Sequence, residues 1–342
     1  MGSASAHLDR RRHTYDVLAT RLAALSDDHL AALLAETASW PANVLGNQSG
    51  MIDVGDAKVF VKKIALADLE RTAENEGSTA NLFDLPVFYQ YGVGSAGFGA
   101  WRELTAYLKA SVWALSGECQ HFPLVYHWRV LPRTAPPLSA EQQAWLDRSP
   151  DYWNHSDAVR ARLEAILAAS ASIVLFLEYV PETLPAWLKD RSTGGCLDAG
   201  SEAAILRVHD QLHDAAAFMN DRGMVHFDLH AHNLLTDGEQ VYAADFGLAQ
   251  CADFDLSLAE RAFFETHRLY DRCYVDWAFV EWLAPKAEPA VLTPALSALV
   301  DHCAPVANIF GNFLNTLIEG SKTTPYPVSE LEAAAAAQSN VH

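Results

Sequence analysis

A short stretch of the chain, residues 225–250, collects side chains that could handle both a proton and a metal ion. Asn233 follows Asp228 by 5 residues and Asp245 follows Asn233 by 12, between two expected short strands. A carboxylate can orient a hydroxyl and take its proton, whereas carboxylate and amide oxygens are the ligands that Mg²⁺ prefers. The stretch therefore offers acid–base chemistry and a place for magnesium.

Two other interpretations of the same stretch remain open. His226, His230 and His232 could join Asp228 in a transition-metal cluster, because an H-x3-H-x-H run brings imidazoles together. The same residues could also serve only as caps and turn residues, which short polar side chains often do. Neither interpretation uses the triplet Asp245-Phe246-Gly247.

The pattern H-x-D-x-x-x-x-N at 226–233, followed by D-F-G at 245–247, resembles the protein-kinase-like catalytic core. The resemblance implies that Asp228 is the catalytic aspartate and that Asn233 and Asp245 bind Mg²⁺ beside the phosphates of ATP or GTP. It also implies an α+β, bilobal protein-kinase-like fold, with a small β-rich N-terminal lobe and a larger, mainly helical C-terminal lobe.

Upstream residues occur in the order that this family uses, over roughly residues 44–250. The run V-F-V-K resembles the strand whose lysine grips the α- and β-phosphates, so we assign that role to Lys62 and its ion-pair partner to Glu103 on the next helix. Lys63 would point to the opposite face of the strand, so a register error of one residue would exchange the two lysines.

Two further nucleotide contacts are implied by the resemblance. The glycine-containing run 46–50 occupies the place of the loop that covers the nucleotide, so Ser49 and Gly50 become candidate phosphate contacts, although the run departs from G-x-G-x-x-G. The strand ending in L-E-Y-V lies where a kinase has its hinge, so backbone groups of Glu178 and Val180 would bind the base.

Two departures from protein kinases favour a small acceptor. His230 stands where protein kinases carry lysine, and this D-L-H-x-x-N form resembles the aminoglycoside and related small-molecule phosphotransferases. No A-P-E follows Gly247, and by Ser257 the chain already enters an amphipathic helix with an S-x-x-E capping box. A segment this short leaves no platform for an extended peptide.

The acceptor pocket is expected beside Asp228, walled by residues 249–285 and by the insertion 133–171. An aromatic stripe at helical spacing could line it or belong to the core. The candidate contacts are His230, Asp253, Asp255, Glu265, Tyr270, Asp271, Tyr274 and Trp277.

The charge of the chain bears on its partners. The net charge is −19, and residues 135–342 carry −17 of it. Such an acidic chain is a poor partner for nucleic acid, whose phosphates require basic patches. The excess can serve solubility, or it can attract a cationic acceptor such as an aminoglycoside or a basic peptide antibiotic; a nucleoside antibiotic stays open.

Composition predicts a globular protein away from membranes. Half of the residues are apolar, and the longest apolar run, 172–180, is far shorter than a membrane span. The start of the chain lacks the apolar core of a secretory leader, so we expect a cytoplasmic location. Five scattered cysteines without a C-x-x-C pair indicate reduced thiols.

Hydrophobic periodicity predicts the organisation of the chain. Helices are expected at 15–25, 28–38, 98–115, 157–169, 202–222, 258–283 and 293–318, and strands on both sides of a turn at Gly55-Asp56, at 122–132 and at 172–180. The expected parts are N-terminal helices (1–43), an N-lobe (44–180, with the insertion), a C-lobe (181–332) and a disordered tail (333–342).

These inferences together predict a kinase that transfers the γ-phosphate of ATP or GTP to a hydroxyl of a small molecule, plausibly an antibiotic, with Mg²⁺ as cofactor. A Ser/Thr protein kinase and a nucleotide-binding pseudokinase scaffold are the alternatives. The sequence leaves the acceptor, the preferred nucleotide and the oligomeric state open.

Overall fold

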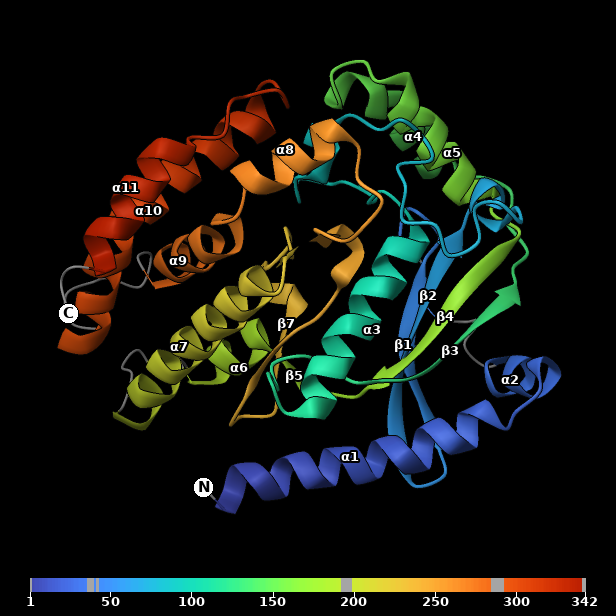
Figure 1. Cartoon of the computed structure of the whole chain (residues 1–342), viewed down its shortest axis with the longest axis horizontal. Helices are drawn as coiled ribbons and strands as arrows, with labels where there is room; N and C mark the ends of the chain where they lie inside the picture. The colour runs from blue at the N-terminus through green and yellow to red at the C-terminus, as the bar shows by residue number, and fades with distance from the viewer. Residues whose placement is uncertain (1, 36–39, 41–42, 192–198, 284–291, 340–342) are drawn as a thin grey trace. The chain divides into compact units, whose positions relative to one another are not determined.

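The computed structural model describes residues 2–35, 40, 43–191, 199–283 and 292–339 (Figure 1). It is a mixed α and β structure whose sheets are small and antiparallel. The chain divides into two units, each described below by itself. Unit 1 comprises Met1–Tyr89 and Ala96–Tyr179, and unit 2 comprises Gln90–Ser95 and Val180–His342.

A four-stranded antiparallel sheet forms the centre of unit 1. Its order is β1-β2-β4-β3, and every residue of β4 up to Leu177 is buried. The expected turn joins the first two strands: Val54 pairs with Ala57, and Gly55 has a φ of 67°, which favours glycine. The strands are β1 (Gln48–Val54), β2 (Ala57–Leu66), β3 (Val125–Pro132) and β4 (Ala171–Glu178).

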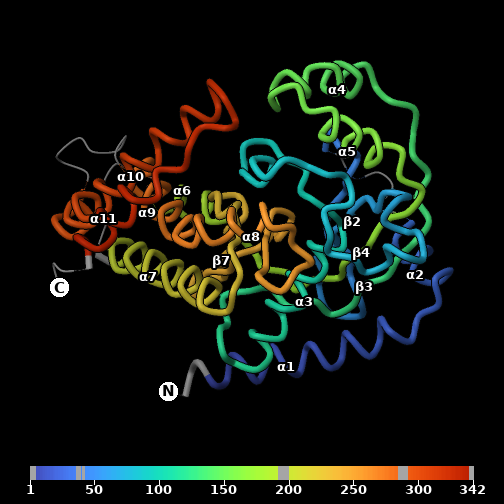
Figure 2. The backbone as a smooth tube through the Cα atoms, turned by 45° about the horizontal axis from the view of Figure 1, so that its top comes forward, coloured from blue at the N-terminus to red at the C-terminus, as the bar shows by residue number. Residues whose placement is uncertain are grey.

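The helices of unit 1 include one that the sequence did not predict. Helix α4 was not predicted because its sequence is mostly polar, has a weak apolar periodicity and contains Pro150. A signal was present at its start, where Ser139 and Gln142 form a capping box. Figures 1 and 2 show α4 and α5 side by side. The helices are α1 (Gly2–Ala23), α2 (Asp27–Leu33), α3 (Ala100–Ser116), α4 (Ala140–Tyr152) and α5 (Asp157–Ala168).

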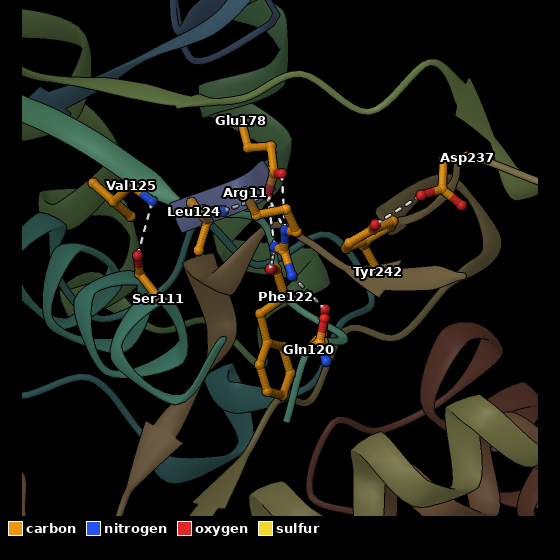
Figure 3. Close-up of polar contacts among 9 residues, drawn as sticks. All are labelled: Arg11, Ser111, Gln120, Phe122, Leu124, Val125, Glu178, Asp237 and Tyr242. Carbon is orange, nitrogen blue, oxygen red and sulfur yellow. Dashed lines mark hydrogen bonds and ion pairs between the residues drawn. The ribbon is translucent and has the colours of Figure 1, made fainter. Parts of the chain in front are cut away.

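The N-terminal helices do not form a part of their own, which corrects the expected boundary at residue 43. Arg11 of α1 is buried, and its guanidinium lies 2.6 Å from the Glu178 carboxylate at the end of β4 (Figure 3). The same guanidinium donates to the carbonyl oxygens of Gln120 and Phe122, and Glu178 also accepts the N–H of Leu124. This network ties α1 to the sheet.

Unit 2 is mainly helical. The expected single helix 258–283 is two helices, because α8 ends where the His267 ring turns back to bond the Phe263 carbonyl oxygen. Its helices are α6 (Leu184–Arg191), α7 (Ala199–Asp221), α8 (Leu258–Thr266), α9 (Tyr270–Leu283), α10 (Pro294–Glu319) and α11 (Val328–Ser339). Two small antiparallel pairings complete it: β5 (Glu182–Thr183), β7 (Leu234–Thr236) and β8 (Val241–Ala243) in one sheet, and β6 (Met224–Val225) with β9 (Gln250–Cys251).

The expected disordered tail is wrong for residues 333–339, which belong to α11. Leu331 and Ala335 are buried, and Gln338 donates hydrogen bonds to Asp276 of α9 and to the His302 carbonyl oxygen of α10. The alanine-rich composition is therefore that of a packed helix. Residues 340–342 lie outside the described part.

Four of the five cysteines lie in the described part of the chain. Cys119, Cys251, Cys273 and Cys303 are free and buried, as the scattered spacing predicts; Cys196 lies outside the described residues. Among the helices that the structure describes, none is long and apolar enough to cross a membrane.

Candidate active site

The lysine and glutamate that the sequence paired form an ion pair in unit 1. Lys62 Nζ of β2 lies 2.7 Å from Glu103 Oε1 of α3, and both side chains are largely buried. Lys62 Nζ also lies over the ring of Tyr107, one helical turn after Glu103. Lys63 takes the opposite face, where it approaches Gln48 and the ring of Trp40. The geometry therefore selects Lys62, although its catalytic role stays a prediction.

A buried carboxylate fixes the start of the helix that carries Glu103. Glu70 accepts the N–H of Ala100 at 2.7 Å through one oxygen, and its other oxygen lies 2.7 Å from Arg162 of α5. A negative charge at a helix N-terminus is favourable, because the first N–H groups have no partner within the helix. The insertion 133–171 thus supplies the arginine that neutralises the Glu70 carboxylate and indirectly positions Glu103.

Residues 48–50 lie in a strand, which corrects the expected loop at this place, while phosphate contact by Ser49 and Gly50 stays a prediction. Both residues lie inside β1, where they pair with Lys62 and Val61. Gly50 is explained by Trp40: a Cβ at this position would meet the indole ring at 2.5 Å. The glycine therefore makes room for a tryptophan, and phosphate contact is not needed to explain it.

The expected hinge lies at the junction of the two units. Glu178 ends β4, and its N–H donates to the Leu124 carbonyl oxygen, so a base could use only its carbonyl. Val180 is the first residue of the second part of unit 2. The sequence suggested a role only for the backbone of Glu178. In the structure, the Glu178 side chain forms an ion pair with Arg11. Base binding at Glu178 and Val180 stays a prediction.

In unit 2, a short hairpin brings the catalytic-loop residues together. Leu234 of β7 pairs with Ala243 of β8, and Ala244 donates to the Asn233 carbonyl oxygen, so Asn233 and Asp245 flank one end of the hairpin. The Asn233 amide nitrogen donates to both the backbone oxygen and the Oδ2 of Asp228, each at 2.9 Å. One end of this hairpin thus carries all three predicted residues.

Asp245 has a backbone conformation that is uncommon for a residue with a side chain. Its φ is 64°, in the left-handed region, and its carboxylate accepts the N–H of Gly247. This local hydrogen bond is the usual way in which aspartate tolerates that region. Burial lowers the pKa of His230, and the Asp245 carboxylate opposes this shift in part; the His230 ring lies 3.7 Å from Asp228 Oδ2.

A buried aspartate of α9 holds the backbone of the predicted catalytic loop. Asp271 accepts the N–H groups of His226 at 2.6 Å and of Phe227 at 2.9 Å, and Phe227 has a φ of 64°. These bonds offset the cost of the left-handed conformation, about 1–3 kcal/mol. The sequence had offered Asp271 as a substrate contact, which is wrong because the residue is buried and bonded to the loop backbone.

Residues 90–95 of unit 2 were missed by sequence reasoning. Tyr91 donates to His267 Nε2 at 2.8 Å, and the side-chain amide of Gln90 donates to the Leu248 carbonyl oxygen. A Cβ at Gly92 would lie 2.6 Å from Asp228 Oδ1. The segment therefore lies against the catalytic loop. The sequence of this segment is rich in glycine and lies between two elements of unit 1. That composition indicated a loop, but it gave no sign that the loop packs in unit 2.

The alternative histidine cluster finds no support in the described residues. His226 is fully buried with its ring 4.9 Å from Phe246, and the His230 and His232 rings are 6.0 Å apart. Burial lowers the pKa of His230, which favours its neutral form at pH 7. The described group whose ligand atoms converge lies elsewhere, at His209, His213 and Asp276.

The aromatic stripe proposed for the acceptor belongs to the core. Tyr270 is fully buried and its ring is 5.0 Å from that of Phe310 on α10, while Tyr274 is 5.7 Å from the same ring. Trp277 fills the space beside Gly311, where a Cβ would meet it at 2.9 Å. The stripe thus forms the seam between α9 and α10, and the burial of Tyr270 corrects it as an acceptor contact; Trp277 is half-buried, and its role as an acceptor contact stays a prediction.

The acidic candidates are exposed. Asp253 and Asp255 lie in the loop before α8, and Glu265 lies on α8 within 3.9 Å of Arg268. An acceptor role for these three residues stays a prediction.

Comparison with known proteins gives one partial likeness. No protein-family model matches the chain. A segment of 97 residues is 32% identical to a cyclin-dependent kinase F-4 of Oryza sativa subsp. japonica. The match covers 28% of this chain and 20% of that protein, so the chain spans about a fifth of the relative's length. This finding supports a kinase-like relationship, and it leaves the acceptor open.

Replacing Asp271 should change how stability depends on pH. Burial raises the pKa of Asp271 to about 7, against the hydrogen bonds from His226 and Phe227, which lower it. Between the unfolded value of 3.8 and about 7, the folded protein therefore holds a proton that the unfolded chain has released. The contribution of this proton to the free energy of unfolding is complete below the unfolded pKa of 3.8, and it is lost as the pH rises through the folded pKa of about 7.

Urea unfolding of wild type and Asp271→Asn at about pH 5 and about pH 8 measures this contribution. The stability of wild type relative to the variant should fall at the higher pH, because asparagine does not titrate. A difference that stays constant or grows would contradict the raised pKa.

Adding one methyl group at Gly92 should impair the catalytic loop. Its Cβ would contact the Asp228 carboxylate and the Phe227 carbonyl oxygen at 3.0 Å or less, so one of them must shift. We expect Gly92→Ala to lower turnover about tenfold or more, since small displacements of reacting groups cost that much. Gly94→Ala separates contact from backbone strain: a Cβ there meets nothing within 4 Å, but the φ of 100° strains any side chain, so a larger loss in Gly92→Ala than in Gly94→Ala reports the contact with Asp228. Equal activity of Gly92→Ala and wild type would show that the segment does not constrain Asp228.

Proposed function

We propose that this protein is a phosphotransferase that moves the γ-phosphate of ATP or GTP to a hydroxyl of a small molecule, plausibly an antibiotic. The observation that carries the proposal is the arrangement at the β7–β8 hairpin, where Asn233 bonds Asp228 and Asp245 follows the adjacent strand. The partial kinase likeness supports phosphotransfer in general. The bilobal kinase-like arrangement, the cytoplasmic location and the choice of acceptor are parts of the proposal.

The proposed step uses one protein carboxylate as the base. An acceptor hydroxyl would donate its proton to Asp228, its oxygen would form the new bond to the γ-phosphorus, and the bond to the β,γ-bridging oxygen would break. The hydrogen bond from the Asn233 amide holds Asp228 Oδ2 in one orientation. A positioned base needs this restraint, because a rotating carboxylate would spend most of its time misaligned.

Magnesium fits the donor set at the hairpin end. The amide nitrogen of Asn233 is committed to Asp228, so its amide oxygen is the atom left for a cation, and Asp245 adds a carboxylate. Mg²⁺ prefers such oxygens and usually keeps water and phosphate oxygens as its other ligands. When bound, the ion would neutralise charge on the phosphates, while Asn233 and Asp245 would hold it in place.

In unit 1, Lys62 is the proposed phosphate ligand. The ion pair with Glu103 restrains a long side chain, so less conformational entropy is lost on binding phosphate. Glu103 in turn depends on α3, whose N-terminus Glu70 and Arg162 hold. Ser49, which pairs with Lys62 across the sheet, and Gly50 remain candidate phosphate contacts.

Two features support a small acceptor, cationic in character. Only ten residues separate Gly247 from Leu258, where α8 starts, and Phe254 and Leu256 of this segment are buried. The segment therefore folds back on unit 2, which leaves little of it to bind an extended peptide. The acidic excess of residues 135–342 would attract a cationic acceptor, and a neutral nucleoside remains compatible with the proposal.

Removing the base should abolish transfer without abolishing nucleotide binding. Wild type and Asp228→Ala, with Mg²⁺ and ATP or GTP, are offered hydroxylated antibiotics of several classes beside a generic protein substrate, and mass spectrometry detects added phosphate. We expect phosphate on a small molecule and a loss of about 10²–10⁴-fold in the variant. Phosphate on protein alone would favour a protein kinase, and nucleotide binding without transfer would favour a pseudokinase.

The neighbouring lysines provide a matched pair for the nucleotide. Lys62→Ala should weaken Mg²⁺–nucleotide binding in calorimetry, because it removes the ammonium that Glu103 holds. Lys63→Ala should leave binding near wild type, since Lys63 lies on the other face of β2 beside Gln48 and Trp40. Equal losses in both variants, or a larger loss for Lys63→Ala, would remove Lys62 from the phosphate site.

A further inference from the structure

Three helices of unit 2 bring ligand-type side chains together: the ligand atoms of His209, His213 and Asp276 lie within 4.8 Å of one another, and Cys303 adjoins His209. His209 and His213 lie one turn apart on α7, Asp276 lies on α9, and Cys303 lies on α10. The ring nitrogen His209 Nε2 is 3.6 Å from Asp276 Oδ1 and 3.6 Å from Cys303 Sγ. His213 Nε2 is 2.8 Å from the same carboxylate oxygen, and the two rings are 4.4 Å apart.

The cluster is buried, with one accessible side. Asp276 is 1% exposed, Cys303 is fully buried, and His209 is 8% exposed, whereas the His213 side chain retains 24% of its exposure. Figures 1 and 2 both show α9, α10 and α11 together, and α7 contacts α9 and α10. A cation could therefore enter past His213 and be enclosed by the other three side chains.

We propose that these residues form a structural zinc site of the His₂-Asp-Cys type. Ligand atoms at about 2.0–2.3 Å from one Zn²⁺ lie roughly 3.3–3.6 Å apart in a tetrahedron. The two 3.6 Å separations match that edge, and the nitrogen, nitrogen and oxygen ligands lie within 4.8 Å of one another. Thiolate, imidazole and carboxylate together are a set that Zn²⁺ favours over Mg²⁺ or Ca²⁺.

Binding requires small, balanced changes at the ligands. The Cys303 thiol gives up its proton to solvent, and both imidazoles bind through Nε2 in their neutral form. The hydrogen bond between His213 and Asp276 opens by about half an ångström, which is the difference from a tetrahedral edge. The His213 ring keeps its second nitrogen for the remaining proton.

Neighbouring groups already hold the ligands as outer-shell partners do. Gln338 of α11 donates to Asp276 Oδ2, the oxygen that the histidines do not contact, and the ring of Phe279 stands edge-on to His209 at 4.9 Å. Such partners fix ligand orientation and support affinity. Because the protein supplies four ligands, the site is closed and structural. It would fasten α9, the helix whose Asp271 holds the catalytic loop, and it is independent of the proposed phosphotransfer.

Cobalt titration of the chelator-treated full-length protein tests the site. Co²⁺ replaces Zn²⁺ in such sites and gives a thiolate charge-transfer band that only a coordinated cysteine produces. We expect one equivalent of Co²⁺ with this band, which Zn²⁺ then displaces. Cys303→Ala should lose the band, and Cys119→Ala, in unit 1, should keep it.

A second variant and a stability measurement keep the test decisive. His213→Gln changes the most accessible ligand, and it should weaken Co²⁺ binding at least about tenfold. Zn²⁺ should raise the unfolding temperature of wild type, because a ligand of the folded state alone stabilises it. If wild type gives no thiolate band, or if Cys303→Ala and His213→Gln bind Co²⁺ as wild type does, the site does not exist.

Discussion

The hydrogen bonds from the backbone of His226 and Phe227 to the buried Asp271 carboxylate are the constraint on which the candidate site depends. They hold Phe227 at a positive φ, and that conformation turns the chain so that Asp228 leaves the core while its neighbours Phe227 and Leu229 stay inside it. A free backbone would not keep this turn, because the left-handed region is unfavourable for phenylalanine. The aspartate must itself be buried, which is why its pKa is raised.

Unit 1 solves a similar problem with another buried carboxylate. Glu70 accepts the first N–H of α3 and is neutralised by Arg162 from the insertion. Breaking one side of such a pair leaves an uncompensated charge, at a cost of about 3–5 kcal/mol. Each unit therefore uses a buried carboxylate to restrain backbone that carries another carboxylate. Glu70 restrains the start of the helix that carries Glu103. Asp271 restrains the loop that carries Asp228. The insertion, which the sequence suggested only as a wall of the acceptor pocket, supports the lysine–glutamate pair through α5.

A structural feature could be predicted from the sequence where the residues that determine it lie close together along the chain. The turn at Gly55 and the capping of α8 follow from short-range patterns, and the structure contains both. Lys62 and Glu103 are 41 residues apart, and their pairing was expected only from the resemblance to the kinase core; the structure contains it as well. Gly50 and Tyr270 were assigned to function because no local pattern shows the packing of their neighbours, Trp40 on Gly50 and Phe310 of another helix on Tyr270. The left-handed Phe227 could not be predicted, since its cause lies 44 residues away in Asp271. The metal-ligand cluster was missed for the same reason, because its four side chains come from three helices.

The segment Gln90–Ser95 has a consequence for how the chain is made. It belongs to unit 2 although both of its flanks belong to unit 1, so the chain passes between the units at three points. Synthesis proceeds from the N-terminus, so Tyr91 leaves the ribosome well before His267, the partner that its hydroxyl needs. Until α8 and α9 have been synthesised, an aromatic side chain that is 3% exposed in the finished protein has no core to enter. During that interval, residues 90–95 lack the packing partners that they have in unit 2. A cut at residue 180 would separate these residues from the rest of their unit, so neither fragment would contain a whole unit 2.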